Sequence, residues 1–158
     1  MATFWQAWRR GAQALLARWR GVPEIDPALW QQTLRTYPFL SALAPEDQDK
    51  LRTLCSLFLQ QKEFHGAHGL QVSDAMALQV AAQACVPLLH WGPPARALRW
   101  YDDFVGIVLY PGPAVARREL MDEAGVVHRY REVLTGEAMQ QGPVMLSWPD
   151  VAAGAHTA

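Results

Sequence analysis

The sequence has few cysteines and no long hydrophobic run, and these absences exclude several classes of protein. Its 158 residues include two cysteines, Cys55 and Cys85, whereas a secreted domain held together by disulfides would need more. Both lie within apolar helical patterns, so we expect two buried, reduced thiols, with a catalytic thiol as the alternative. No stretch reaches the ~18–20 apolar residues that a membrane span requires.

An excess of charge of one sign is also missing. The chain has 14 basic and 15 acidic side chains and a net charge of −1, so its composition does not favour nucleic-acid binding, which needs a basic surface. GxGxxG, Walker A and GxSxG motifs are absent. The N-terminus is not a signal peptide, because Arg9 and Arg10 interrupt the expected apolar core. The cytoplasm is therefore the expected location.

The first pattern that is present is an amphipathic segment over residues 2–20. Apolar side chains recur there at steps of three and four residues, namely Phe4, Trp5, Trp8, Ala12, Leu15, Leu16 and Trp19. Two interpretations of this basic amphipathic segment are open. It is a helix that lies on a membrane surface, or it is a helix docked on its own domain or a loosely ordered terminus, and we favour the second interpretation. We predict a helical unit over residues 1–22 and a domain over residues 23–158, with Gly21, Pro23 and Pro27 in the linker.

The middle of the chain predicts helices and the second half predicts strands. One helix begins at Pro45, and a second, capped by Ser73, runs to about His90 with a bend or end at Pro87. Strands are predicted at 104–110, 126–134 and 144–148. Helices followed by strands favour an α+β fold, with N-terminal helices packed on a small, mostly antiparallel sheet.

Several short patterns occur together in a fixed order. They are Phe58-Leu59-Gln60-Gln61-Lys62, Gln83-Ala84-Cys85 with Pro87-Leu88-Leu89, Trp100-Tyr101 through Phe104 into Val108-Leu109-Tyr110-Pro111, Gly136-Glu137-Ala138, and Gln141 to Trp148 with Asp150-Val151 and Gly154. No single pattern is specific. Their order and spacing over residues 30–154 resemble the Mlc titration factor A (MtfA) family.

The resemblance implies a zincin-like, cytoplasmic, zinc-dependent peptidase with aminopeptidase-like activity on small peptides. It also implies a link to sugar-uptake control through binding of the Mlc repressor. In the family, an HExxH helix that holds zinc and supplies the general base follows the segment matching Leu146-Ser147-Trp148. This sequence ends at Ala158 without that motif. We therefore expect a domain truncated before its active-site helix, inactive alone, with no catalytic or zinc-binding residue.

Substitutes for that motif within the chain are weak. His65 and His68 form an HxxH pair in a glycine-rich predicted loop, but two imidazoles make a poor metal site, and a solvated loop is the simpler interpretation. The acidic pairs Asp102-Asp103 and Asp122-Glu123 are interpreted as solvated charge, because neighbouring side chains point apart on a strand or helix.

One segment has a predicted binding role. In zincin-like peptidases, an edge strand near the zinc helix binds extended substrate through its backbone. By analogy we assign this role to Val144, Met145, Leu146, Ser147 and Trp148, with Trp148 as an apolar wall; an ordinary core strand is the alternative. The rival hypotheses for the whole chain are a non-catalytic module that binds a regulator such as Mlc, and membrane-surface association through residues 2–20.

Overall fold

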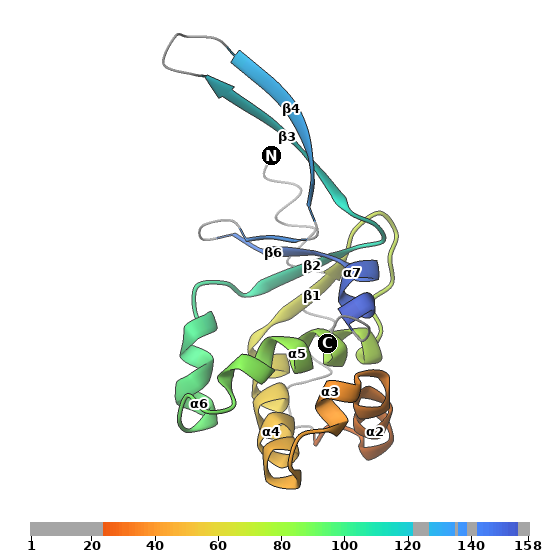
Figure 1. Cartoon of the computed structure of the whole chain (residues 1–158), viewed down its shortest axis with the longest axis vertical. Helices are drawn as coiled ribbons and strands as arrows, with labels where there is room; N and C mark the ends of the chain where they lie inside the picture. Colours follow the sequence, from red (N-terminus) through yellow and green to blue (C-terminus); the bar gives the residue numbers. More distant parts are fainter. Residues whose placement is uncertain (1–23, 122–126, 135, 139–141, 155–158) are drawn as a thin grey trace.

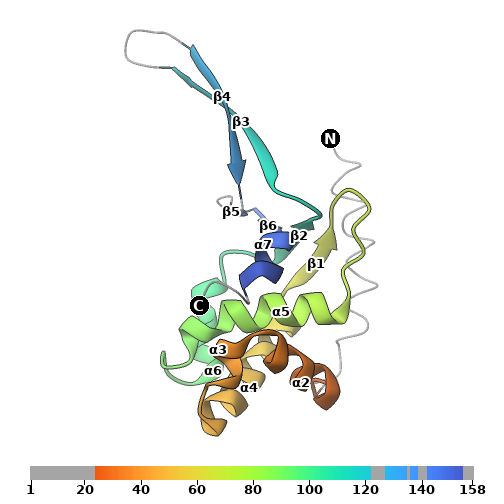
Figure 2. The same ribbon diagram turned by 45° about the vertical axis from the view of Figure 1, so that its right-hand side comes forward.

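Figure 1 shows the computed structural model of the chain, which describes residues 24–121, 127–134, 136–138 and 142–154. A layer of helices lies beneath a small sheet, and a long β-hairpin projects away from the helices (Figures 1 and 2). The predicted α+β class is confirmed. The amphipathic segment 2–20, the predicted boundary at residue 22 and the pair Asp122-Glu123 lie outside the described residues. None of the helices in the described ranges is long and apolar enough to cross a membrane.

Prolines open most of the described helices. These are α2 (Pro27–Thr36), α3 (Pro38–Ser41), α4 (Pro45–Gln61), α5 (Asp74–Cys85), α6 (Pro94–Ala97) and α7 (Trp148–Ala153), with the 3₁₀ turns η1 (Val86–Leu88) and η2 (Leu98–Tyr101). Proline is favoured at a helix start because its missing N–H has no partner there in any case. Pro27 was wrongly predicted to lie in a linker. It begins α2, and the carboxylate of Asp26 caps that helix by accepting hydrogen bonds from the backbone N–H groups of Ala28 and Leu29.

The two strongest helix predictions are confirmed with one change of length. Helix α4 begins at Pro45 as predicted, and Ser73 Oγ accepts from the backbone N–H of Met76 at 3.2 Å to cap α5. Helix α5 ends at Cys85 rather than near residue 90. The 3₁₀ turn η1 follows at that point, since Pro87 cannot continue the α-helical bonding pattern.

The main sheet is mixed, not mostly antiparallel. Its strands are β1 (Glu63–Gly66), β2 (Gly106–Tyr110), β6 (Val144–Ser147) and β5 (Gly136–Ala138), in that spatial order. Strand β2 runs parallel to both β1 and β6, and β5 alone is antiparallel to its neighbour. The prediction was wrong in two respects. It missed β1, which is parallel to β2 because α5 crosses over between them, and it did not foresee that the predicted strands β2 and β6 would also pair in parallel. Strands β3 (Ala114–Met121) and β4 (Val127–Leu134) form the separate antiparallel hairpin.

The two faces of the main sheet have different neighbours. Phe64, Ile107 and Leu109 point toward the helices and are buried in the core with Leu54 and Leu78 from α4 and α5. Residues between them in sequence point the opposite way, because successive strand residues alternate between faces. The described helices all lie on the first face (Figure 2). The second face is therefore free of described helices, and we call it the open face.

Candidate functional site

The segment predicted to bind substrate lies inside the sheet. Val144–Ser147 form β6, which pairs with β2 on one side and with β5 on the other. Trp148 begins α7 and is partly buried against the core. The segment is therefore not the edge of the described sheet, because the strand beyond it is β5. A role for Val144–Trp148 in substrate binding stays a prediction.

A single row of side chains crosses the open face. Strand register places His65 of β1, Val108 of β2, Met145 of β6 and Glu137 of β5 side by side. We call these four residues the cross-strand row. All four are half-buried, and the hydroxyl of Tyr110, one position further along the same face, donates to Met145 Sδ at 3.5 Å. The row combines an imidazole, a carboxylate and two apolar side chains.

The two histidines of the HxxH pair belong to different structural elements. His65 lies in β1 instead of the predicted loop, whereas His68 follows the strand with a left-handed backbone (φ 52°) and its ring centroid lies 5.6 Å from that of Tyr110. Within the described ranges, no three His, Cys, Asp or Glu side chains come together in a group that could hold a metal ion. Because a catalytic zinc site normally needs three protein ligands, the described residues do not fit a zinc ion.

Acidification is expected to destabilise the fold through His65. Burial lowers the pKa of His65 from its usual 6.5, and Glu63 only partly opposes this. The unfolded chain therefore binds more protons between the lowered pKa and 6.5, so stability is fully present above pH 6.5 and falls as the pH drops through that window. Urea unfolding across this range should show a shallower pH dependence for His65→Gln, while the exposed control His90→Gln keeps the wild-type slope.

Polar side chains anchor α7 to the helical layer. The carbonyl oxygen of Val151 lies 3.0 Å from Gln83 Nε2, which donates to it, and 3.2 Å from the Tyr37 hydroxyl. The same hydroxyl lies 2.9 Å from Gln79 Oε1. Burial raises the pKa of Tyr37, and a side-chain hydrogen bond between Tyr37 and Gln83 opposes this shift. A Cβ on Gly154 would meet Gln83 Oε1 at 2.5 Å. These contacts fix the direction in which the chain leaves β6.

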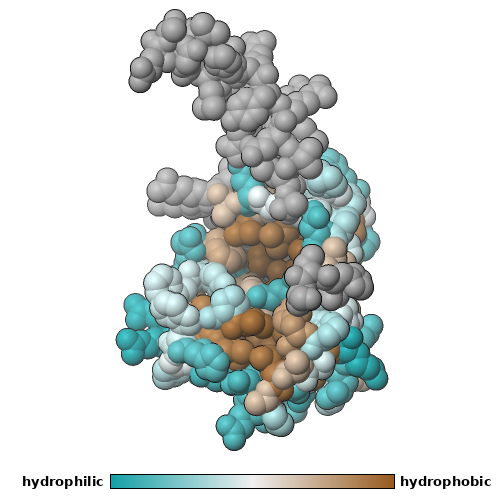
Figure 3. Space-filling model, in the orientation of Figure 1, coloured by the Kyte–Doolittle hydropathy of each residue, from teal (hydrophilic) through white to brown (hydrophobic). Residues whose placement is uncertain are grey.

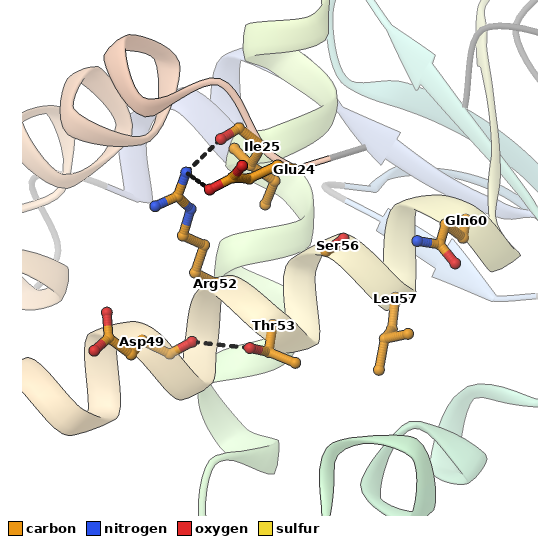
Figure 4. A pocket seen from close by; sticks show the side chains of 8 residues that line it. All are labelled: Glu24, Ile25, Asp49, Arg52, Thr53, Ser56, Leu57 and Gln60. Atoms are coloured by element: carbon orange, nitrogen blue, oxygen red, sulfur yellow. Dashed lines mark hydrogen bonds and ion pairs between the residues drawn. The ribbon is translucent and has the colours of Figure 1, made fainter. Parts of the chain in front are cut away.

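A groove of about 440 Å³ lies along α4 (Figure 4). It is lined by Glu24, Ile25, Asp49, Arg52, Thr53, Ser56, Leu57 and Gln60. Two of its polar side chains bond locally: Arg52 donates to the carbonyl of Ile25 and lies 3.9 Å from Glu24, and the hydroxyl of Thr53 donates to the carbonyl of Asp49 at 3.2 Å. The groove therefore presents no converging set of catalytic side chains.

Other residues singled out in the sequence have structural roles. Cys55 and Cys85 are buried and free, as predicted, and burial raises the pKa of the Cys55 thiol well above its usual range, which makes it a poor nucleophile. Asp102 and Asp103 are exposed, which confirms that they are solvated charges.

An exposed tryptophan pair was not predicted from the sequence. Trp91 and Trp100 are 57% and 64% exposed, and their ring centroids lie 5.0 Å apart in an edge-to-face arrangement. The turn through Gly92 and Pro93 leads into α6 and brings the two rings together. The two tryptophans that flank a Gly-Pro-Pro turn are the sequence feature from which this surface could have been predicted.

Comparison with known proteins identifies the family of the chain. The model of the glucose-regulated metallo-peptidase M90 family matches residues 5–158. Mlc titration factor A of Escherichia coli O1:K1 / APEC and that of Escherichia coli strain K12 / DH10B are each 37% identical to the chain over 122 residues. These alignments cover 77% of this chain and 44% of each relative, so the chain spans less than half the length of these relatives. The resemblance to the Mlc titration factor A family is thus confirmed, and the chain belongs to the glucose-regulated metallo-peptidase M90 family.

Proposed function

We propose that this chain supplies the sheet and packing helices of a cytoplasmic, zinc-dependent peptidase with aminopeptidase-like activity on small peptides. The family match over residues 5–158 carries the proposal. Zinc in such an enzyme activates a water molecule and polarises the peptide carbonyl. The sequence contains no HExxH, and the described residues do not fit the ion. The zinc ligands and the general base are therefore assigned to chain outside residues 1–158.

Apolar surface beside β6 supports this assignment. On the face shown in Figure 3, hydrophobic side chains gather at the level of the sheet and again over the helical layer. Leu146, Trp148 and Val151 lie partly exposed at the margin of the core, on β6 and α7. Exposed apolar patches of this kind mark interfaces. We propose that further segments of the peptidase domain cover this margin. The hydrogen bonds from Gln83 and Tyr37 to the carbonyl of Val151 hold α7 beside it.

Strand β5 is the part of this chain best placed to bind an extended peptide. One side of β5 pairs with β6, and no described strand pairs with its other side. A Cβ on Gly136 would lie 3.2 Å from both Leu146 Cδ2 and the carbonyl oxygen of Met145, so glycine lets β5 lie close to β6. Backbone groups at such an edge bind a peptide by strand addition. In this proposal Val144–Trp148 support the binding edge from behind.

A peptidase assay tests where the zinc chemistry resides. We expect residues 1–158, supplied with zinc and an aminoacyl-anilide substrate, to show no turnover above buffer. The Escherichia coli relative, assayed in parallel, is the positive control. If the purified 158-residue chain turns over the substrate and a zinc chelator abolishes this turnover, the zinc ligands do not lie outside residues 1–158 and the assignment is overturned. Sequencing the gene past the Ala158 codon gives an independent result, since an HExxH soon afterwards supports the proposal.

The tryptophan pair favours a second function, which is the binding of a regulatory protein such as the Mlc repressor. Tryptophan and arginine dominate the energetics of protein interfaces. The exposed rings of Trp91 and Trp100 lie close in sequence to the exposed side chains of Arg96 and Arg99. The name of the relatives refers to Mlc. Such binding requires no metal and is compatible with the first function.

Removing one ring of the pair is expected to weaken this binding. Trp100→Ala should raise the Kd for the Mlc repressor about thirtyfold or more, because truncation of a tryptophan that is an interface hot spot costs about 2 kcal/mol or more. Titration calorimetry with purified repressor gives the measurement. Val105→Ala is the matched control, because Val105 is also exposed (50%) but is not part of the pair. Equal affinities for wild type and both variants would place the binding surface elsewhere.

A further inference from the structure

The β3–β4 hairpin forms an arm that projects from the rest of the fold. Figures 1 and 2 show it leading away from the helices, and its two strands form a sheet of their own. The strands pair with each other over their whole length. No other element in the described ranges packs extensively against either of them. An isolated two-stranded hairpin is only marginally stable in water, which favours a role for the arm in binding a partner.

Each strand of the arm has an open edge in the part of the chain that the structure describes. The hairpin has two strands, so alternate backbone N–H and C=O groups of β3 and β4 face away from the neighbouring strand. Such an edge pairs with another extended segment unless the protein protects it. The arm is therefore suited to binding a partner by strand addition.

The charged residues of the arm are concentrated on one face. The two strands contain four arginines and two glutamates, and no lysine or aspartate. Register makes Arg117 the direct partner of Arg131, and Glu119 the partner of Arg129. These four positions share a face, because residues two apart in a strand lie on the same side. We call it the arginine face; it has three arginines and one glutamate, whereas the opposite face has one of each.

Two arginines of this face oppose each other within the hairpin. Like charges at directly opposite positions, as at Arg117 and Arg131, destabilise a strand pair. A carboxylate supplied by a third strand would relieve this repulsion, because guanidinium groups bind carboxylates through paired hydrogen bonds. Strand β4 is the better edge for such a strand, since both of its charged positions on the arginine face are arginines, whereas β3 has one arginine and Glu119 there.

A second copy of the chain is a poor partner for these edges. When a strand pairs with its own copy about a two-fold axis, one residue lies opposite itself and its neighbours pair symmetrically about it. An axis at Arg129, Arg131 or Glu132 of β4 places two like charges opposite each other. An axis at Tyr130 pairs Arg129 with Arg131 of the copy. The central positions of β3, residues 117–119, are all charged as well. The charge pattern therefore disfavours self-pairing.

A nucleic acid is also less complementary to the arm than an acidic protein segment. Binding to phosphates requires a surface that is basic throughout. Here glutamates alternate with the arginines, and the sequence that joins the two strands includes Asp122 and Glu123. The chain as a whole has a net charge of −1. A protein segment with acidic residues at selected positions fits this pattern better than a uniform polyanion does.

We propose that the arm binds an acidic, extended segment of another protein, which adds as a third strand beside β4. Acidic residues at two alternate positions of that segment lie opposite Arg129 and Arg131, and the second of them also neutralises Arg117. Backbone pairing supplies the affinity, and the spacing of the acidic residues supplies the specificity. This surface is distinct from the tryptophan pair, and its binding requires no metal.

Peptide binding by the 158-residue chain tests the proposal. The probe is a fluorescent peptide of about ten residues, with glutamates at two alternate positions in a run of threonine and valine. Arg129→Ala and Arg131→Ala should each raise its Kd about tenfold or more, because each removes charge-assisted hydrogen bonds. Arg118→Ala is the matched control: this arginine is at an alternate position of β3, on the opposite face, so the Kd should change by less than about twofold. Fluorescence anisotropy gives the measurement.

Hydrogen exchange and a second peptide locate the interaction and guard against misfolding. Bound peptide should slow exchange of backbone amides in β4, while α4 and α5 exchange alike in wild type and in all variants. A peptide with the same composition but adjacent glutamates should bind about tenfold more weakly, because adjacent strand residues lie on opposite faces. The proposal is overturned by no binding at about 1 mM peptide, by tighter binding of duplex DNA through the same arginines, or by protection of β4 that comes from dimerisation without peptide.

Discussion

Replacing Gly66 by alanine should lower the free energy of unfolding by about 3 kcal/mol or more, which is large for the addition of one methyl group. A Cβ at this position would lie 1.7 Å from the carbonyl oxygen of Leu70 and 2.6 Å from its carbonyl carbon. Both are backbone atoms, so no side-chain rotation relieves the overlap. The loop must move as a whole, or β1 must separate from it.

The loop after β1 has little freedom to move. The backbone N–H of Ala67 donates to the carbonyl of Leu109 at 2.8 Å, and that of Leu70 donates to Ala67 at 3.1 Å. His68 and Gly69 both have left-handed backbones, with φ values of 52° and 79°. Displacing such a loop costs its hydrogen bonds and disturbs the contact between the rings of His68 and Tyr110.

Two matched glycine variants distinguish the cost of steric overlap with the added Cβ from the cost of backbone strain. Gly112→Ala should change stability little, because no atom lies within 4 Å of the added Cβ. Gly69→Ala has the same free space but a left-handed φ, so it should cost about 1 kcal/mol from strain alone. Urea denaturation of the three variants gives the comparison. A Gly66→Ala variant as stable as Gly112→Ala would mean that the loop relaxes without cost.

The sequence predicted the elements whose patterns are local. Helix α4 was placed correctly because a first-turn proline and acidic residues precede its apolar stripe, and α5 because Ser73 caps it. Strand β2 was located because Pro111-Gly112-Pro113 ends a run of β-branched and aromatic residues, and β6 because Gly142-Pro143 precedes another such run. Each of these depends on contacts within a few residues, which a linear pattern records.

The features missed depend on contacts between distant segments. Strand β1 has only four residues, ends at Gly66 and leads directly into a turn that contains Gly69, so His65 was assigned to a loop. It is a strand because β2, some 40 positions later, pairs with it. The three residues of β5 carry no alternating pattern, yet they occupy the side of β6 that was predicted to be the substrate-binding edge. The strand in the candidate site was thus predictable from the sequence, whereas its place in the sheet was not.

Lys62 illustrates the same limit, because nothing in its sequence neighbours indicates that a lysine there is 5% exposed. Its ammonium group donates to the carbonyl oxygens of Tyr101 and Phe104 and lies 4.1 Å from the centroid of the Phe104 ring. Burial lowers the pKa of Lys62, although Asp102 and Asp103 oppose this shift. The side chain thus connects the end of α4 to the segment that leads into β2.

Lys62→Met should therefore lower the free energy of unfolding by about 2–3 kcal/mol. The variant keeps the apolar stem, but it leaves two carbonyls without a donor and removes the contact with the Phe104 ring. These two losses outweigh the gain from no longer burying a charge. Lys50→Met on the same helix is the control, because the structure shows no hydrogen bond from Lys50 to the segment before β2. Chemical denaturation gives the difference, and equal stability of the two variants would contradict the proposed link.

The pH dependence of this difference provides a second test. Because the pKa of Lys62 is lowered on folding from 10.5, the unfolded chain binds more protons in the window below 10.5. The free energy of unfolding of the wild type should therefore increase with pH through that window, and the Lys62→Met variant should not show this part of the increase. The gap between the two proteins should widen between neutral pH and about pH 10. A gap that narrows would mean that the lysine must be charged to hold the two carbonyls.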